Sequence, residues 1–168
     1  MFPERSRDMD DPADVARDAL ATAPIAVPTE AESFSLEVTV FTISVEPSHV
    51  DGLPAFDLRI LVPPLAMVTE ESIPKVVEDE WFRTFELRLA DIAGATRGHQ
   101  SLEVHTDRGP AMIAVDITLA DTNLDRALDD ITAVAEYVEG TYAEGIIPGY
   151  SYTDVARTLR ERATGSSG

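Results

Sequence analysis

The first half of the chain contains two segments in which hydrophobic and polar residues alternate, the pattern of a half-buried β-strand. Residues 34–45 form the first segment, and residues 56–62 form the second, which ends at Pro63-Pro64. Asp51-Gly52 lies between them, and this dipeptide favours a tight turn because both residues tolerate positive φ angles. The pattern therefore predicts a β-hairpin.

The alternation within residues 34–45 changes phase. Apolar residues occupy even-numbered positions up to Val40 and odd-numbered positions from Phe41 onward. An extra residue that bulges from a strand produces such a change. We interpret the segment as one strand with a β-bulge near Val40 and Phe41, although a strand covered on both faces gives a similar pattern.

A second alternating pair follows later in the chain. Residues 102–104 and 113–119 are separated by a turn at residues 107–109, which contain Asp107-Arg108-Gly109. The spacing predicts a second β-hairpin. The sequence therefore predicts four strands.

Two long segments have the spacing of amphipathic helices. One covers residues 74–92, and the other begins after a cap at Asp121 or Thr122 and ends before Gly145. Their apolar stripes are Ile73, Val77, Trp81, Phe85 and Leu89 in the first, and Leu124, Leu128, Ile131, Ala135, Val138 and Tyr142 in the second. Each stripe predicts a helix with one buried face.

Two shorter helices are predicted near the ends of the chain. Asp11 is a suitable N-cap, and Pro12 suits the first helical position, which favours a helix over about residues 12–21. A last helix is predicted over residues 152–162, where Val155 and Leu159 are the apolar positions.

The element order α-ββ-α-ββ-α-α predicts an α+β fold, an antiparallel sheet of two hairpins with helices packed on one face. We expect a single domain over residues 11–163, a flexible acidic arm at residues 1–10 and a disordered tail at residues 164–168. Over about residues 12–140 the element order is similar to the type III secretion chaperone-like fold, whose members usually dimerise. That similarity rests on no motif and implies no activity.

The charge of the chain indicates the solvent in which it works. The chain has 31 acidic residues against 13 Lys and Arg, a net charge of −18, and Lys75 is its only lysine. An ionic strength of roughly 1 M shortens the Debye length to about 3 Å and removes most of the repulsion among these carboxylates. Because 44% of the residues are hydrophobic, we expect a packed core and not a disordered chain. The composition favours a halophilic protein, and an ordinary acidic protein from a high-GC bacterium is the alternative.

Several classes of protein lack support in the sequence. No segment is long and apolar enough to span a membrane, and residues 1–18 lack the apolar core of a signal peptide, so we expect a cytoplasmic protein. Without cysteine there is no disulfide and no thiolate nucleophile. No phosphate-binding loop or dinucleotide fingerprint is present, and no cofactor is expected. Nucleic acid is not the expected partner, because the arginines near the C-terminus alternate with acidic residues, but net charge does not exclude it in a high-salt proteome.

Trp81 and its neighbours are one candidate interaction surface. Phe82 and Phe85 widen the apolar arc of their helix beyond a core-facing stripe. Part of that arc, or the open face of the sheet, is therefore a candidate surface for a protein partner, including a second copy of the chain.

The segment at residues 136–152 is the second candidate. It combines Glu136, Glu139 and Glu144 with tyrosines at positions 137, 142, 150 and 152. Carboxylates three residues apart share one helical face, so Glu136, Glu139 and Glu144 with Tyr142 could act as paired acid and base. The candidate binding residues of the segment are Glu139, Tyr142, Tyr150 and Tyr152. Burial of the tyrosine rings and termination of the helix by the glycines explain the same residues structurally.

A metal site is a weaker alternative. His99, His105 and a carboxylate such as Glu103 could together supply ligands, but no histidine pair has metal-ligand spacing, so none is expected.

Glu80-Trp81-Phe82 and the glycine- and tyrosine-rich segment from Gly140 to Tyr150 also carry a family resemblance. The chain after Phe34 resembles an uncharacterised family of haloarchaeal proteins that has a similar Trp-Phe helix and a similar Gly-Ile-Pro-Gly-Tyr segment. The resemblance implies a lineage but no activity. The leading hypothesis is a non-enzymatic binding or adaptor module; an enzyme that uses the Glu/Tyr segment and a component of a nucleoprotein complex are the alternatives.

Overall fold

A computed structural model describes residues 11–30, 32–96, 101–147, 151–153 and 158. The helices are α2 (Pro12–Thr22), α3 (Leu65–Val68), α4 (Lys75–Leu89) and α5 (Leu124–Glu144), and a 3-10 helix, η1, covers Ile92–Ala95. The strands are β1 (Ala26–Pro28), β2 (Phe34–Leu36), β3 (Thr42–Val50), β4 (Leu53–Val62), β5 (Ser101–Arg108) and β6 (Ile113–Ala120). The fold is α+β, as predicted.

The strands form one antiparallel sheet in the order β1-β2-β3-β4-β6-β5. Both predicted hairpins are present, and β4 joins them by pairing with β6, with Leu58 opposite Ile117. The first hairpin turns at Asp51-Gly52, where both residues have positive φ angles of 51° and 80°. This is the conformation for which an Asp-Gly turn is favoured.

The sheet has six strands among the described residues, and four were predicted. The segment interpreted as one bulged strand is two strands, β2 and β3, which pair with each other so that Phe34 lies opposite Val45. The change of phase at Val40 and Phe41 therefore marks the connection between two strands, and the prediction of a bulge was wrong. β1 was missed because its three residues are too few to show a period.

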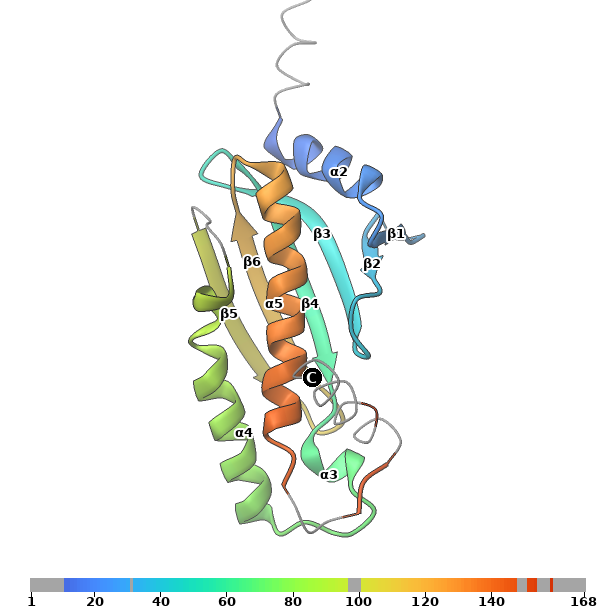
Figure 1. Cartoon of the computed structure of the whole chain (residues 1–168), viewed down its shortest axis with the longest axis vertical. Coiled ribbons are helices and arrows are strands. Elements are labelled where there is room, and N and C mark those ends of the chain that lie inside the picture. Colours follow the sequence, from blue (N-terminus) through green and yellow to red (C-terminus); the bar gives the residue numbers. More distant parts are fainter. Residues whose placement is uncertain (1–10, 31, 97–100, 148–150, 154–157, 159–168) are drawn as a thin grey trace, which may run out of the picture.

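The helices cover one face of the sheet (Figure 1), where α5 runs along the strands, α2 crosses one end and α4 lies beside α5. The alternation of burial along β6 shows which face this is: Ile113, Val115, Ile117 and Leu119 are fully buried, and the residues between them are less so. The opposite face is polar. There Arg59 donates two hydrogen bonds, of 2.8 and 2.9 Å, to its cross-strand neighbour Asp116.

α5 begins one or two residues later than predicted. Its N-cap is Asn123, whose side chain accepts a hydrogen bond from the amide of Arg126 at 3.0 Å. Asp121, one of the two predicted caps, is fully buried and forms an ion pair with the Arg126 guanidinium. Asp121 therefore fixes the turn that precedes the helix.

The last predicted helix falls mostly outside the described residues. Tyr152, its first predicted residue, instead forms an isolated antiparallel bridge with Thr69. Two backbone hydrogen bonds of 2.8 Å, from Glu70 to Ser151 and from Thr153 to Val68, hold this segment against the end of α3. The chain after α5 thus returns to the connection between α3 and α4.

Candidate binding groove

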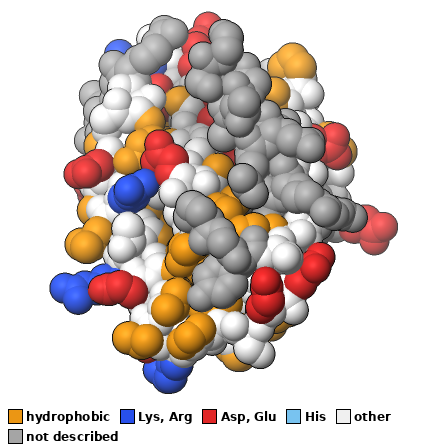
Figure 2. Space-filling model, turned by 60° about the horizontal axis from the view of Figure 1, so that its bottom comes forward, with side chains coloured by type: hydrophobic (Ala, Val, Ile, Leu, Met, Phe, Trp, Pro, Cys, Tyr) orange, Lys and Arg blue, Asp and Glu red, His pale blue; other side chains and the backbone are white. Residues whose placement is uncertain are grey.

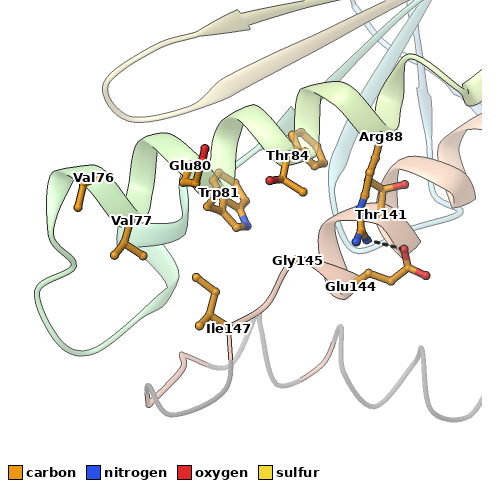
Figure 3. A pocket seen from close by; sticks show the side chains of 11 residues that line it. Val76, Val77, Glu80, Trp81, Thr84, Arg88, Thr141, Glu144, Gly145 and Ile147 are labelled. Atoms are coloured by element: carbon orange, nitrogen blue, oxygen red, sulfur yellow. Dashed lines mark hydrogen bonds and ion pairs between the residues drawn. The ribbon is translucent and has the colours of Figure 1, made fainter.

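A groove lies between α4 and the C-terminal end of α5 (Figure 3) and encloses a volume of about 480 Å³. Its lining from α4 is Val76, Val77, Glu80, Trp81, Thr84, Phe85 and Arg88, and its lining from the end of α5 and the segment beyond is Thr141, Glu144, Gly145 and Ile147. Figure 2 shows hydrophobic side chains gathered on this end of the molecule, with acidic side chains around them. The groove is therefore mainly apolar with a charged rim.

Stacked aromatic rings form the back of the groove. The rings of Trp81 and Phe85 are nearly parallel, with centroids 5.6 Å apart, because residues four apart share one helical face. Tyr142 of α5 meets both rings edge-on, and Phe41 packs edge-on against Tyr142. These contacts fix the indole of Trp81 in one orientation.

The indole N–H of Trp81 has no hydrogen-bond partner among the described residues, although the side chain is only 5% exposed. A buried donor without an acceptor costs roughly 1–3 kcal/mol. A Cβ atom added at Gly145 would lie 3.0 Å from the indole nitrogen, so glycine allows the end of α5 to pack closely against Trp81. The aromatic wall thus contains a buried N–H group that donates to none of the described residues.

An ion pair closes one end of the groove. The Arg88 guanidinium lies 3.0 Å from the Glu144 carboxylate and connects α4 to the last turn of α5. The Tyr137 hydroxyl donates to the carbonyl of Arg88 at 2.9 Å and holds the same turn of α4. Glu80 lies toward the other end and adds negative charge to the rim (Figure 3).

Tyr142, a candidate acid–base residue, is part of the core. Its side chain is fully buried, and its hydroxyl donates a 2.7 Å hydrogen bond to the carbonyl of Pro63 at the end of β4. Burial, and secondarily the negative charge of Glu78, raises the pKa of this hydroxyl above its usual range. A phenol held in this way is a poor general base at neutral pH.

The Glu139 side chain also binds a backbone group. Its carboxylate accepts a hydrogen bond of 2.9 Å from the amide of Val40, in the connection between β2 and β3, and the side chain is buried. Among the described residues that line the groove, neither Glu139 nor Tyr142 appears. The two groups therefore do not converge on it.

The other predicted site residues lie around the groove or outside the described residues. Phe82 is half-buried on the far side of α4, where the Arg108 guanidinium of β5 lies 4.9 Å from its ring centroid. Tyr152 is buried, and its hydroxyl donates to the carbonyl of Ile147, which positions that lining residue. Tyr150 lies outside the described residues. Of the seven predicted site residues, the groove lining contains Trp81 and Phe85.

The residues of the metal alternative point elsewhere. Glu103 and His105 are exposed on β5 and alternate with the half-buried Leu102 and Val104, so they belong to the polar face of the sheet. His99 lies outside the described residues. Within the described part of the chain, no group of three or more metal-ligating side chains is placed to hold an ion.

Sequence patterns did not reveal the groove itself. Val76, Thr84 and Arg88 lie outside the predicted apolar stripe of their helix. They line the groove only because α4 packs against α5. Gly145 was interpreted as a helix terminator, and it does end α5, with its amide bonded to the carbonyls of Thr141 and Tyr142. Gly145 also allows the end of α5 to pack closely against Trp81, and no pattern in a single sequence indicates that contact.

The fold and the groove together define a small α+β protein with a single covered sheet face and a preformed apolar groove at one end of its helical layer. The chain belongs to a family of unknown function, DUF5813, which matches residues 22–162. No curated protein and no solved structure matches the chain. Within the described residues, no helix combines the length and apolar character that crossing a membrane requires.

Proposed function

We propose that this protein is a non-enzymatic binding module that holds an apolar part of a partner protein in the groove between α4 and α5. The observation that carries the proposal is a mainly apolar groove with an aromatic wall of Trp81 and Phe85. A segment of polypeptide suits such a groove, because its apolar side chains fill the space against the rings. The volume of the groove falls in the range of roughly 300–1,000 Å³ typical of binding pockets.

The placement of the Glu/Tyr segment favours binding over catalysis. Glu139 and Tyr142 use their polar atoms to hold the backbone at Val40 and Pro63. An acid–base pair must instead be within hydrogen-bond reach of a substrate. The groove offers an apolar lining and an aromatic wall, which are the features of a recognition site.

Gly145→Ala tests the proposal because its Cβ atom would displace the indole ring that forms the wall of the groove. Gly145 has a φ angle of −83°, so alanine fits the backbone without strain, whereas its Cβ atom would press on Trp81. The wild-type chain and the variant are used as baits in a native lysate prepared in about 2 M KCl. We expect wild type to retain a partner that Gly145→Ala loses.

Gly140→Ala is the matched control, since a Cβ atom there meets nothing within 4 Å. The retained protein is then purified and titrated against the bait. Trp81 is the only tryptophan of the chain, so its emission reports directly on the groove. A partner that leaves Trp81 emission unchanged, or that binds both glycine variants equally, would show that the groove is not the binding site.

We also propose that the protein works in a cytoplasm of molar salt, as expected of the haloarchaeal lineage that the sequence resembles. The net charge of −18 and the single lysine support this proposal. The thermal unfolding midpoint should fall on dialysis from about 2 M to about 0.1 M KCl, because repulsion among surface carboxylates returns as screening is lost. A midpoint that stays constant across this range would refute it.

A further inference from the structure

The side of α4 opposite the core carries a regular stripe of four residues. Val76, Glu80, Arg83 and Leu87 are spaced by four, three and four positions, which places them along one line on the helix surface. Val76 is 73% exposed and Leu87 is 63% exposed, and Glu80 and Arg83 are also exposed. This spacing is that of the contact seam of a coiled coil.

The stripe is complementary to itself when a second copy lies antiparallel. We propose that two copies of the chain dimerise through α4 in this orientation. Val76 then packs against Leu87 of the partner subunit, and Glu80 lies against the partner's Arg83. The two-fold symmetry repeats each pair, so the contact has two apolar layers at its ends and two opposite-charge layers in its centre.

The charges on the stripe decide the orientation. In a parallel, in-register arrangement Glu80 would face the partner's Glu80, and Arg83 would face the partner's Arg83. Like charges in direct contact oppose such an arrangement. Only the antiparallel arrangement in this register pairs each apolar residue with an apolar residue and each charge with its opposite.

This inference extends the proposed function by naming one protein partner, and it rests in part on other side chains. Val76 and Glu80 belong both to the stripe and to the groove lining, whereas Arg83 and Leu87 lie outside the described lining. A dimer would therefore place the partner's α4 along the rim of the groove. Variants of Leu87 and Arg83 test the dimer, and Gly145→Ala tests the groove.

The first experiment is sedimentation velocity of the full chain in about 2 M KCl over a range of concentrations. We expect a monomer–dimer equilibrium in which Leu87→Glu raises the dissociation constant about tenfold or more, because each dimer contains that contact twice. Met67→Glu is the matched control, since Met67 is 57% exposed on α3, away from the stripe. A wild-type chain that stays monomeric at all concentrations, or a dimer equally sensitive to both variants, would overturn the proposal.

Charge reversal tests the pairing between Glu80 and Arg83. It is done at the lowest KCl concentration at which circular dichroism shows an intact fold, because salt screens ion pairs. Glu80 and Arg83 already lie 4.0 Å apart within one chain, so the two single variants are also mixed. Glu80→Arg and Arg83→Glu should each weaken the dimer, and the mixture should restore it as a heterodimer. Positions 80 and 83 carry like charges within each variant chain, so restoration requires contact between chains, and a mixture as weak as either variant would exclude the pairing.

The absence of cysteine from the chain allows a direct test of orientation. Glu80→Cys and Arg83→Cys chains are oxidised separately and as a mixture. The antiparallel register brings position 80 of one copy next to position 83 of the other, so the mixed disulfide should form faster than either homodimeric disulfide. Faster homodimeric disulfides would indicate a parallel contact and overturn the antiparallel register.

The groove and the dimer can fail independently. If Gly145→Ala loses partner capture but dimerises as wild type does, the groove binds its partner separately from the dimer contact.

Discussion

The two longest helices, α4 and α5, lie side by side but use their polar groups differently (Figure 1). In the last turns of α5, the side chains of Glu139 and Tyr142 form hydrogen bonds with the backbone of segments about 80 to 100 residues away in sequence. Among the described residues, α4 has one side chain that binds backbone outside the helix: the Glu78 carboxylate accepts hydrogen bonds from the amides of Leu65 and Ala66. In the same part of the chain, the outer side of α4 makes no contact of this kind.

The difference shows which side chains are available for function. A polar group that already satisfies a buried backbone amide or carbonyl cannot leave it without a cost of roughly 1–3 kcal/mol. The ionisable groups of Glu139 and Tyr142 in α5 therefore stabilise the fold. α4 instead offers an exposed stripe and one side of a groove. The contrast between the helices can be tested by substitutions that measure how much individual side chains of each helix contribute to the free energy of unfolding.

The largest expected effect is that of Tyr142→Ala. This substitution removes a fully buried ring that contacts Phe41, Trp81 and Phe85, and we expect a loss of about 3–5 kcal/mol in the free energy of unfolding. Denaturant unfolding at constant KCl, followed by circular dichroism, measures it. Leu87→Ala on the outer side of α4 is the control and, at a protein concentration at which the chain is monomeric, should change stability by less than about 0.5 kcal/mol.

Tyr142→Phe separates the ring from the hydroxyl. It leaves the packing intact but leaves the Pro63 carbonyl unpaired, so we expect a loss of about 1–3 kcal/mol. If Tyr142→Ala cost no more than Leu87→Ala, the distinction between the two helices would be refuted.

Glu139→Ala is expected to have the next largest effect. It removes the charged acceptor of the Val40 amide, a part-buried hydrogen bond, and should destabilise the protein by about 1–3 kcal/mol. Glu136, one turn earlier on the same helix, is exposed, so Glu136→Ala should be nearly neutral. Equal losses for the two glutamates in denaturant unfolding would show that their common charge, and not the contact with Val40, sets the effect.

These contacts also show what one sequence can predict. The Asp-Gly turn, the second hairpin and the two long helices follow from local patterns, and the structure contains them all. The division of residues 34–45 into β2 and β3 was not predictable from phase alone, because a bulge and a tight connection both shift the alternation by one position. Only the pairing of Phe34 with Val45 distinguishes them.

The candidate site was predicted only in part, because contacts between distant parts of the chain also form it. Trp81 and Phe85 are conspicuous in the apolar stripe of their helix, and both line the groove. The groove also needs Gly145 and Ile147, which reach Trp81 only because the chain after α5 packs against α4. Sequence separation of more than 60 residues places that contact beyond any local pattern.

The burial of Tyr142 should make the stability of the protein depend on pH in the alkaline range. Because burial raises the pKa of Tyr142 in the folded state, the folded protein retains this proton while the unfolded chain loses it above a pKa of about 10. This contribution to stability is complete below pH 10 and falls by as much as about 1.4 kcal/mol per pH unit above it. Thermal unfolding between pH 9 and 11.5 should therefore show a steeper loss for wild type than for Tyr142→Phe. Equal slopes would show that Tyr142 titrates normally.

The smallest effect is expected at Asp79, on the exposed side of α4. Hydrogen bonds from Lys75, at 2.8 Å, and then from Arg108 lower the pKa of this carboxyl from its usual value. A lowered pKa means that the stabilisation is present above the unfolded value of 3.8 and is lost as the pH falls through the folded value. NMR titration of the Asp79 carboxyl should give a higher pKa in Lys75→Gln than in wild type. The shift should persist in 1 M KCl, because a direct hydrogen bond is screened far less than a distant charge. If salt alone removed it, the only lysine of the chain would act through its field and not through contact.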